Sequence, residues 1–197
     1  MTPPIFIYLH GFLSSPGTHK ASQLANYLRA QSSPIELRIP ALRDEAPLAF
    51  AAAETAVRDA CAQSDTVALI GSSMGGFYAT ILAQRYRLRA ALINPAVAPQ
   101  RLLHRHYGVN RNPYTDHEFT LDATHAAYLE QIAPAAIRAP QLFWLLVQTG
   151  DEVLDYRDAV EFYARCKQTV EAGGDHRFIG FERYLPELIN FLQSPIV

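Results

Sequence analysis

Residues 66–80 read TVALIGSSMGGFYAT, and this stretch decides the predicted fold. Its first five residues form an apolar run typical of a buried strand, and its last five begin a segment with helical spacing. Between them, residues 71–75 fit the pattern Gly-x-Ser-x-Gly with Ser73 at its centre. In this pattern the serine lies on a strained turn, and the flanking glycines let strand and helix approach closely. The stretch therefore predicts an exposed, nucleophilic Ser73 at the carboxyl end of a strand.

Apolar runs rich in Ile, Val and Leu recur on both sides of this turn and indicate strands that are covered on both faces. They alternate with segments of helical spacing, so we expect right-handed crossovers and helices on both faces of an open sheet. The predicted strands are 5–9, 35–39, 66–70, 90–93, 142–147 and 168–170, and the predicted helices are 20–30, 47–62, 76–86 and 157–165. Together with the serine turn, this order predicts an α/β-hydrolase fold with a mostly parallel six-stranded sheet.

Residues 95–140 interrupt the alternation. They contain several prolines and aromatic residues, two predicted helices near 99–106 and 119–131, and no predicted strand. Ligands of such folds bind beyond the carboxyl ends of the strands, so we expect this helical insertion, or cap, to cover the site. A chain of 197 residues suits one domain, and we expect residues 1–197 to form a single α/β-hydrolase domain.

Composition argues against several other classes of protein. The formal charge of −2 and the lack of a Lys/Arg cluster disfavour a nucleic-acid partner. The apolar run 5–9 is too short for a membrane span and follows no basic segment, so we expect neither a membrane anchor nor a targeting signal. Cys61 and Cys166 form no Cys-x-x-Cys pair, and His104 and His106 would point to different faces of a helix, so we predict no metal site. The sequence leaves the oligomeric state open.

A serine nucleophile needs a base and an acid that orients the base. His176 follows a late strand and the flexible Gly173-Gly174-Asp175, whereas the other histidines after Ser73 fall in or near the insertion, so we predict His176 as the base. The loop after strand 142–147 offers three carboxylates. We favour Asp151, nearest the strand end, with Glu152 and Asp155 as alternatives. Asp155 also suits the N-cap of the next helix, and we expect Glu152 to face solvent.

Two backbone N–H groups are expected to form the oxyanion hole. That of Met74 follows the serine, and that of Phe12 lies in the loop after the first strand, where this fold places its second donor. His10 precedes the serine in the chain, and we interpret it as a residue that shapes this loop through hydrogen bonds.

Several blocks resemble the small bacterial YqiA-type esterases, in order and over nearly the whole chain. These blocks are residues 8–12 with 14–16, 71–80, 94–97, 112–115, 148–156 and 173–176. The resemblance implies an α/β-hydrolase fold, carboxylesterase or acyl-thioesterase activity, no cofactor and a cytoplasmic location. It also supports Ser73, Asp151 and His176 as the catalytic residues.

These observations predict a serine carboxylesterase that hydrolyses a small-molecule ester through an acyl-enzyme intermediate. The alternatives are an acyl-CoA thioesterase or a lyase on the same residues, or a binding protein that keeps the fold without catalysis. The aromatic residues of the insertion are candidates either for ordinary core packing or for the lining of an apolar acyl pocket beside Trp144: Tyr107, Tyr114, Phe119 and Tyr128. Of these five aromatic candidates, we predict that Tyr107, Tyr114 and Trp144 bind the substrate.

Overall fold

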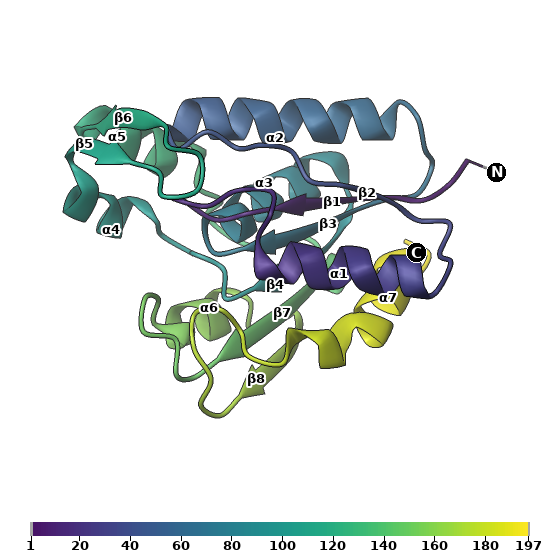
Figure 1. Cartoon of the computed structure of the whole chain (residues 1–197). Coiled ribbons are helices and arrows are strands. Elements are labelled where there is room, and N and C mark those ends of the chain that lie inside the picture. The colour runs from purple at the N-terminus through teal and green to yellow at the C-terminus, as the bar shows by residue number, and fades with distance from the viewer. Residues whose placement is uncertain (1, 197) are drawn as a thin grey trace.

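The computed structural model describes residues 2–196 and contains a six-stranded parallel sheet (Figure 1). The strand order is β2-β1-β3-β4-β7-β8, and each neighbouring pair is parallel. The strands are β1 (Ile5–Leu9), β2 (Glu36–Arg38), β3 (Val67–Ser72), β4 (Arg89–Ile93), β7 (Phe143–Gln148) and β8 (Lys167–Glu171). All six coincide with predicted strands to within two residues, so the predicted sheet is confirmed.

Helices cover both faces of this sheet. On one face lie α1 (His19–Ala30) and α7 (Leu185–Gln193), and on the other lie α2 (Ala46–Cys61), α3 (Met74–Tyr86) and α6 (Tyr156–Phe162). Every residue of β1, β3 and β7 is buried, which explains why these strands are apolar apart from Ser72 and Gln148 at their carboxyl ends. Local signals fix the helix starts, since Thr18 caps α1, Asp155 caps α6 and a proline stands in the first turn of α2. The final helix, α7, was not among the predicted elements.

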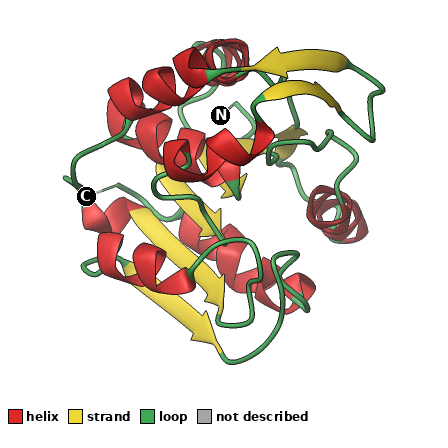
Figure 2. Cartoon of the chain, turned by 90° about the vertical axis from the view of Figure 1, so that its left-hand side faces the viewer, coloured by secondary structure: helices red, strands yellow, loops and turns green. Residues whose placement is uncertain are grey.

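The insertion is only partly helical. It contains α4 (Gln100–Leu103), the 3₁₀ helix η1 (His104–His106), an antiparallel hairpin of β5 (Gly108–Arg111) and β6 (Glu118–Leu121), and α5 (Ala123–Ile132). The expectation of no strand here was therefore wrong, and the predicted helix 119–131 begins only at Ala123. Along β6 exposed and buried residues alternate, with Phe119 and Leu121 facing the core beside α2. This period of two is the signature of a strand with one buried face. Figure 2 shows the hairpin apart from the main sheet.

Two further 3₁₀ helices, η2 (Pro140–Leu142) and η3 (Phe181–Tyr184), precede β7 and α7. Within residues 2–196 no helix is both long enough and apolar enough to cross a membrane.

Candidate active site

Ser73 lies on a sharp turn between β3 and α3. Its backbone has φ 55° and ψ −124°, a strained conformation for a residue with a side chain. The turn is possible because neighbouring glycines let the backbone segments touch: a Cβ on Gly75 would overlap the carbonyl oxygen of Leu9, and one on Gly71 would lie 2.7 Å from Cα of Gly76. The sequence pattern thus produces the expected geometry, with Ser73 exposed to a cleft at the carboxyl end of the sheet.

Three residues distant in sequence form a hydrogen-bonded chain at this turn. Nε2 of His176 lies 3.1 Å from Oγ of Ser73, and Nδ1 of His176 lies 2.8 and 2.9 Å from the two carboxylate oxygens of Asp151. Because a carboxylate accepts, Nδ1 carries the proton and Nε2 is left to accept from the serine hydroxyl. The Asp151 side chain is 2 % exposed, and its Oδ1 also accepts the N–H groups of Val153 and Leu154. The imidazole is therefore held in the tautomer that a general base requires.

The other two carboxylates of this loop do not contact the imidazole. Asp155 caps α6 by accepting the N–H of Arg157 and pairs with its guanidinium, which lowers the pKa of Asp155. Glu152 is exposed to solvent, as expected, and its Oε2 also accepts the backbone N–H of His176 at 2.9 Å. That bond is also the largest cause of the lowered pKa of Glu152. Glu152 thus holds the main chain of the histidine, and Asp151 its ring.

Two backbone N–H groups near Ser73 are the ones predicted to form an oxyanion hole. Met74 is the first residue of α3, where N–H groups have no intrahelical acceptor. Gly11 packs against Ser73 so closely that a Cβ on it would lie 3.1 Å from Cβ of Ser73, and Phe12 comes next. In the part of the chain that the structure describes, neither the N–H of Met74 nor that of Phe12 donates to a protein acceptor.

His10 fixes the loop that carries Phe12, which is the structural role predicted for it. The ring is buried, Nδ1 donates to the carbonyl of Gly11 at 3.0 Å, and Nε2 accepts the N–H of Leu42 at 3.1 Å. Burial lowers the pKa of His10, which favours the neutral ring that these two bonds require.

Two buried amides hold the histidine loop, a role that no sequence pattern predicted. Asn94, at the end of β4, donates from Nδ2 to the carbonyls of Asp175 and His176, and its Oδ1 accepts the N–H of Gln148. Gln148, at the end of β7, accepts the N–H groups of Asp175 and Ile179 and donates to the carbonyl of Ile179. Both residues stood in the blocks that carried the resemblance, but nothing local to either indicates which loop it binds.

A buried amide–carboxylate pair, Asn112 with Asp44, joins the insertion to the Phe12 loop. Nδ2 of Asn112 donates to both oxygens of Asp44 and to the carbonyl of Ser14, and Oδ1 of Asp44 accepts the N–H of Leu13. Asn112 is 1 % exposed and Asp44 is 8 % exposed, so these bonds are shielded from water. The insertion therefore braces the loop that presents the Phe12 N–H.

A cavity of about 450 Å³ opens beside Ser73 and His176. Its other walls are residues 11–14, residues 17–20, Tyr114 and Arg177. Of the five aromatic candidates, Tyr114 lines this cavity, whereas Tyr107 is 44 % exposed and lies outside the lining. Phe119 packs edge-on against Phe12, and Tyr128 packs against the core.

The proposed role of Trp144 beside an acyl pocket is not compatible with the structure. Trp144 is fully buried on the α1 and α7 face of the sheet, where its Nε1 donates to Thr169 and its ring packs against Phe191. Phe119 belongs to the core on the opposite face. The sheet therefore separates Trp144 from the aromatic residues of the insertion.

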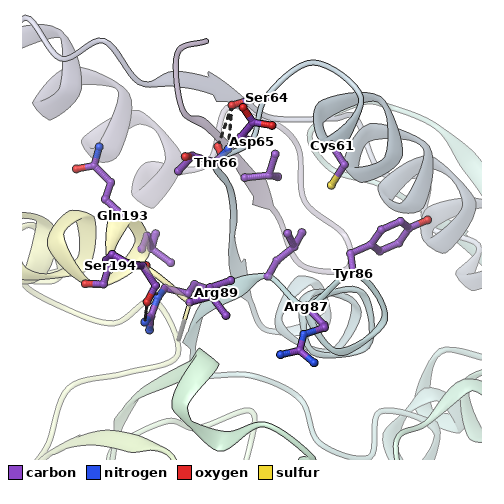
Figure 3. Close-up of a pocket in the computed structure, with 14 residues that line it drawn as sticks. Cys61, Ser64, Asp65, Thr66, Tyr86, Arg87, Arg89, Gln193 and Ser194 are labelled. Carbon is purple, nitrogen blue, oxygen red and sulfur yellow. Dashed lines mark hydrogen bonds between the residues drawn. The ribbon is translucent and has the colours of Figure 1, made fainter. Parts of the chain in front are cut away.

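A second cavity, of about 430 Å³, lies at the amino ends of β3 and β4 (Figure 3). Two of its polar residues bind the protein itself: Oγ of Ser64 donates to the carbonyls of Pro3 and Thr66, and the guanidinium of Arg89 donates to the carbonyls of Gln141, Ser194 and Pro195. Within the described residues, no group of three His, Cys, Asp or Glu side chains is arranged to hold a metal.

Comparison with known proteins identifies the family and the fold. The model of a family described as "Uncharacterised protein family (UPF0227)" matches residues 5–193. Among solved structures, Est1E from Butyrivibrio proteoclasticus superposes with a TM-score of 0.72 at 14 % identity, covering 98 % of this chain and 90 % of that one.

Two further solved structures share the same architecture. A protein from Xanthomonas campestris, described as an α/β serine hydrolase without a lid, has a TM-score of 0.65 at 14 % identity, covering 100 % of this chain and 85 % of that one. The esterase domain of a Rhodothermus marinus protein has a TM-score of 0.66 at 17 % identity, covering 96 % of this chain and 85 % of that one. The predicted α/β-hydrolase fold is confirmed.

Proposed function

This chain belongs to the family UPF0227, and blocks of its sequence resemble the YqiA-type esterases. We propose that it is a serine hydrolase that cleaves small-molecule carboxylic esters. One observation carries the proposal: the hydrogen-bonded chain from Asp151 through His176 to Ser73, on a strained turn beside two N–H groups without protein acceptors. The Rhodothermus domain is described as an esterase and the Xanthomonas protein as a serine hydrolase, which agrees with the proposal.

The geometry supports a two-step acyl transfer. In the first step Oγ of Ser73 attacks the carbonyl carbon while Nε2 of His176 takes the hydroxyl proton, and the N–H groups of Phe12 and Met74 stabilise the oxyanion. The tetrahedral intermediate collapses, the bond to the leaving oxygen breaks, and His176 returns the proton to the leaving alcohol. In the second step water gives its proton to His176, attacks the acyl-enzyme and releases the carboxylic acid, and the proton returns to Ser73.

Asp151 supports both steps without taking up a proton. Its carboxylate faces Nδ1–H and stabilises the imidazolium that forms in each step. No part of this chemistry requires a metal or an organic cofactor. A thioester would follow the same route with a thiol leaving group, so esters and thioesters with matched acyl chains must be compared directly. The resemblance also leads us to expect a cytoplasmic location.

Labelling with a fluorophosphonate tests this proposal, because the probe reacts with activated serines. We expect stoichiometric labelling of Ser73, identified by mass spectrometry, and turnover of p-nitrophenyl butyrate by the same preparation. Ser72→Ala is the matched control: this residue precedes the nucleophile but is buried in β3, so labelling should persist. A folded protein that neither reacts with the probe nor turns over ester or thioester would be a binding protein instead.

A further inference from the structure

One wall of the active-site cavity is cationic. Among the residues that line it, Lys20 and Arg177 carry positive charge and His19 gains one on protonation, while no carboxylate is exposed in the lining. The chain as a whole has a formal charge of −2, so this local excess of positive charge does not reflect overall composition. A cavity lined by one sign of charge attracts ligands of the opposite sign.

The two cations are held side by side. Lys20 lies in the first turn of α1, and its Nζ donates to the carbonyl of Arg177 at 2.9 Å, which leaves two further N–H donors on the ammonium. The guanidinium of Arg177 makes no hydrogen bond or ion pair with other described residues. The same wall contains the amino end of the 12-residue α1, whose dipole adds to the positive potential.

The carboxylates nearest to Lys20 are engaged elsewhere. Asp175 accepts the backbone N–H of Arg177. Asp151 accepts from Nδ1 of His176 and from two backbone N–H groups. Burial has the largest effect on Lys20 and lowers its pKa to about 8. Asp175 and Asp151 oppose this effect, and the positive charge of Arg177 adds to it. The ammonium is thus largely protonated at pH 7 and partly stripped of water, which strengthens its attraction for an anion.

The position of this wall relative to the reacting atoms indicates which half of the substrate it contacts. His176 must protonate the leaving oxygen, so the leaving group lies on the side of its imidazole. Arg177 follows His176 directly in the chain, and Lys20 is bonded to the backbone of Arg177. The acyl carbonyl, by contrast, is held at Ser73 by the N–H groups of Phe12 and Met74.

We propose that the site prefers esters whose leaving group carries an anion, a carboxylate or a phosphate, and that Lys20 and Arg177 determine this preference. The inference rests on the proposed hydrolase function and names its substrate class. Neutral esters still enter the cavity and react with Ser73, at a lower kcat/KM. The preference is greatest below about pH 8 and declines as the pH rises through the pKa of Lys20, leaving the part due to Arg177.

Three butanoyl esters test the proposal, made from 4-hydroxybutanamide, 4-hydroxybutanoate and 3-hydroxypropyl phosphate. The first is a neutral match for the second, and the third separates phosphate from carboxylate recognition. Butanoate release measured by chromatography should show about 10-fold higher kcat/KM for at least one anionic ester than for the amide, the magnitude expected for charged hydrogen bonds. In Lys20→Met and Arg177→Met this ratio should fall several-fold, with the neutral ester changed by less than about 3-fold.

Arg87→Gln is the matched control, because it removes one exposed cation at the opposite end of the sheet. The ratio should be unchanged in this variant. Equal losses on neutral and anionic esters in Lys20→Met would overturn the proposal and make Lys20 a residue that positions the histidine loop. A wild-type ratio near 1, with Ser73-dependent hydrolysis of the neutral ester intact, would also overturn it while leaving the hydrolase function standing. Absence of any Ser73-dependent hydrolysis would instead reject the proposed function itself.

Discussion

The two ends of β3 carry cavities of nearly the same size, about 450 Å³ beside Ser73 and about 430 Å³ beside Ser64. Both contain a serine and an arginine, yet the two serines differ in their hydrogen-bond partners and in their backbone conformation. Ser64 donates to backbone carbonyls, whereas Ser73 is held in a strained conformation with a histidine nitrogen at its hydroxyl. Cavity volume therefore does not identify the reactive end. Strained backbone and donors without acceptors do.

This difference follows from the direction of the parallel strands. Helices begin where parallel strands end, so free N–H groups and positive dipole ends gather at the carboxyl edge, as at Met74 in α3 and at the start of α1. At the amino edge helices end instead. Here the guanidinium of Arg89 donates to the carbonyls of Ser194 and Pro195, which follow α7 directly. The carboxyl edge of the sheet is therefore the edge at which the protein can stabilise an anionic intermediate.

The largest expected effect tests the two serines against each other. Ser73→Ala should lower kcat for p-nitrophenyl butyrate by more than about 10³-fold, because only binding and the oxyanion hole remain. Ser64→Ala should leave kcat within about 2-fold, since that hydroxyl serves only the fold. Thermal unfolding of both variants separates loss of chemistry from loss of structure. If Ser73→Ala kept kcat within tenfold of the wild type, Ser73 would not be the nucleophile.

A comparison of two carboxylates in one loop gives the next largest effect. Asp151→Asn should lower kcat by up to about 10⁴-fold with little change in KM, because the imidazole loses the partner that fixes its tautomer. Asp155→Asn should keep turnover and lower the free energy of unfolding by at most about 0.5–2 kcal/mol, since it caps α6. Steady-state kinetics and urea unfolding measure both. The reverse ranking would assign the acid to Asp155.

The pH dependence should distinguish the catalytic base from the structural histidine. At acid pH kcat/KM for a neutral ester should decrease, because a protonated His176 cannot accept the serine proton. His10→Gln should keep this acidic decline even if its lower stability reduces the folded fraction. A flat profile in the wild type would count against His176 as base.

The smallest expected effect concerns Glu152. Glu152→Gln keeps an oxygen that can accept the N–H of His176, so kcat should change by less than about 3-fold and stability by about 0.5 kcal/mol or less. Glu152→Ala removes that acceptor and should lower kcat further without changing the acidic decline of the pH profile. If Gln abolished turnover as completely as Asp151→Asn, the charge of Glu152 would be part of the chemistry.

Local patterns predicted the sheet and the elements that carry Ser73, Asp151 and His176. Patterns with two meanings led to errors: the alternation at Phe119 and Leu121 in β6 was read as helix. Asn94 and Gln148 could not be assigned, because a buried amide reveals its role only through partners that are distant in sequence.

The sequence by itself determined the strained turn at Ser73 and the chain order of nucleophile, acid and base, because small residues at fixed spacing leave the backbone few alternatives. Only the tertiary structure decided on which face of the sheet Trp144 lies and which groups surround Lys20. A strand that is apolar on both faces carries no signal of which way a side chain points. The electrostatic surroundings of Lys20 depend on a loop more than 150 residues later, which only folding brings beside it.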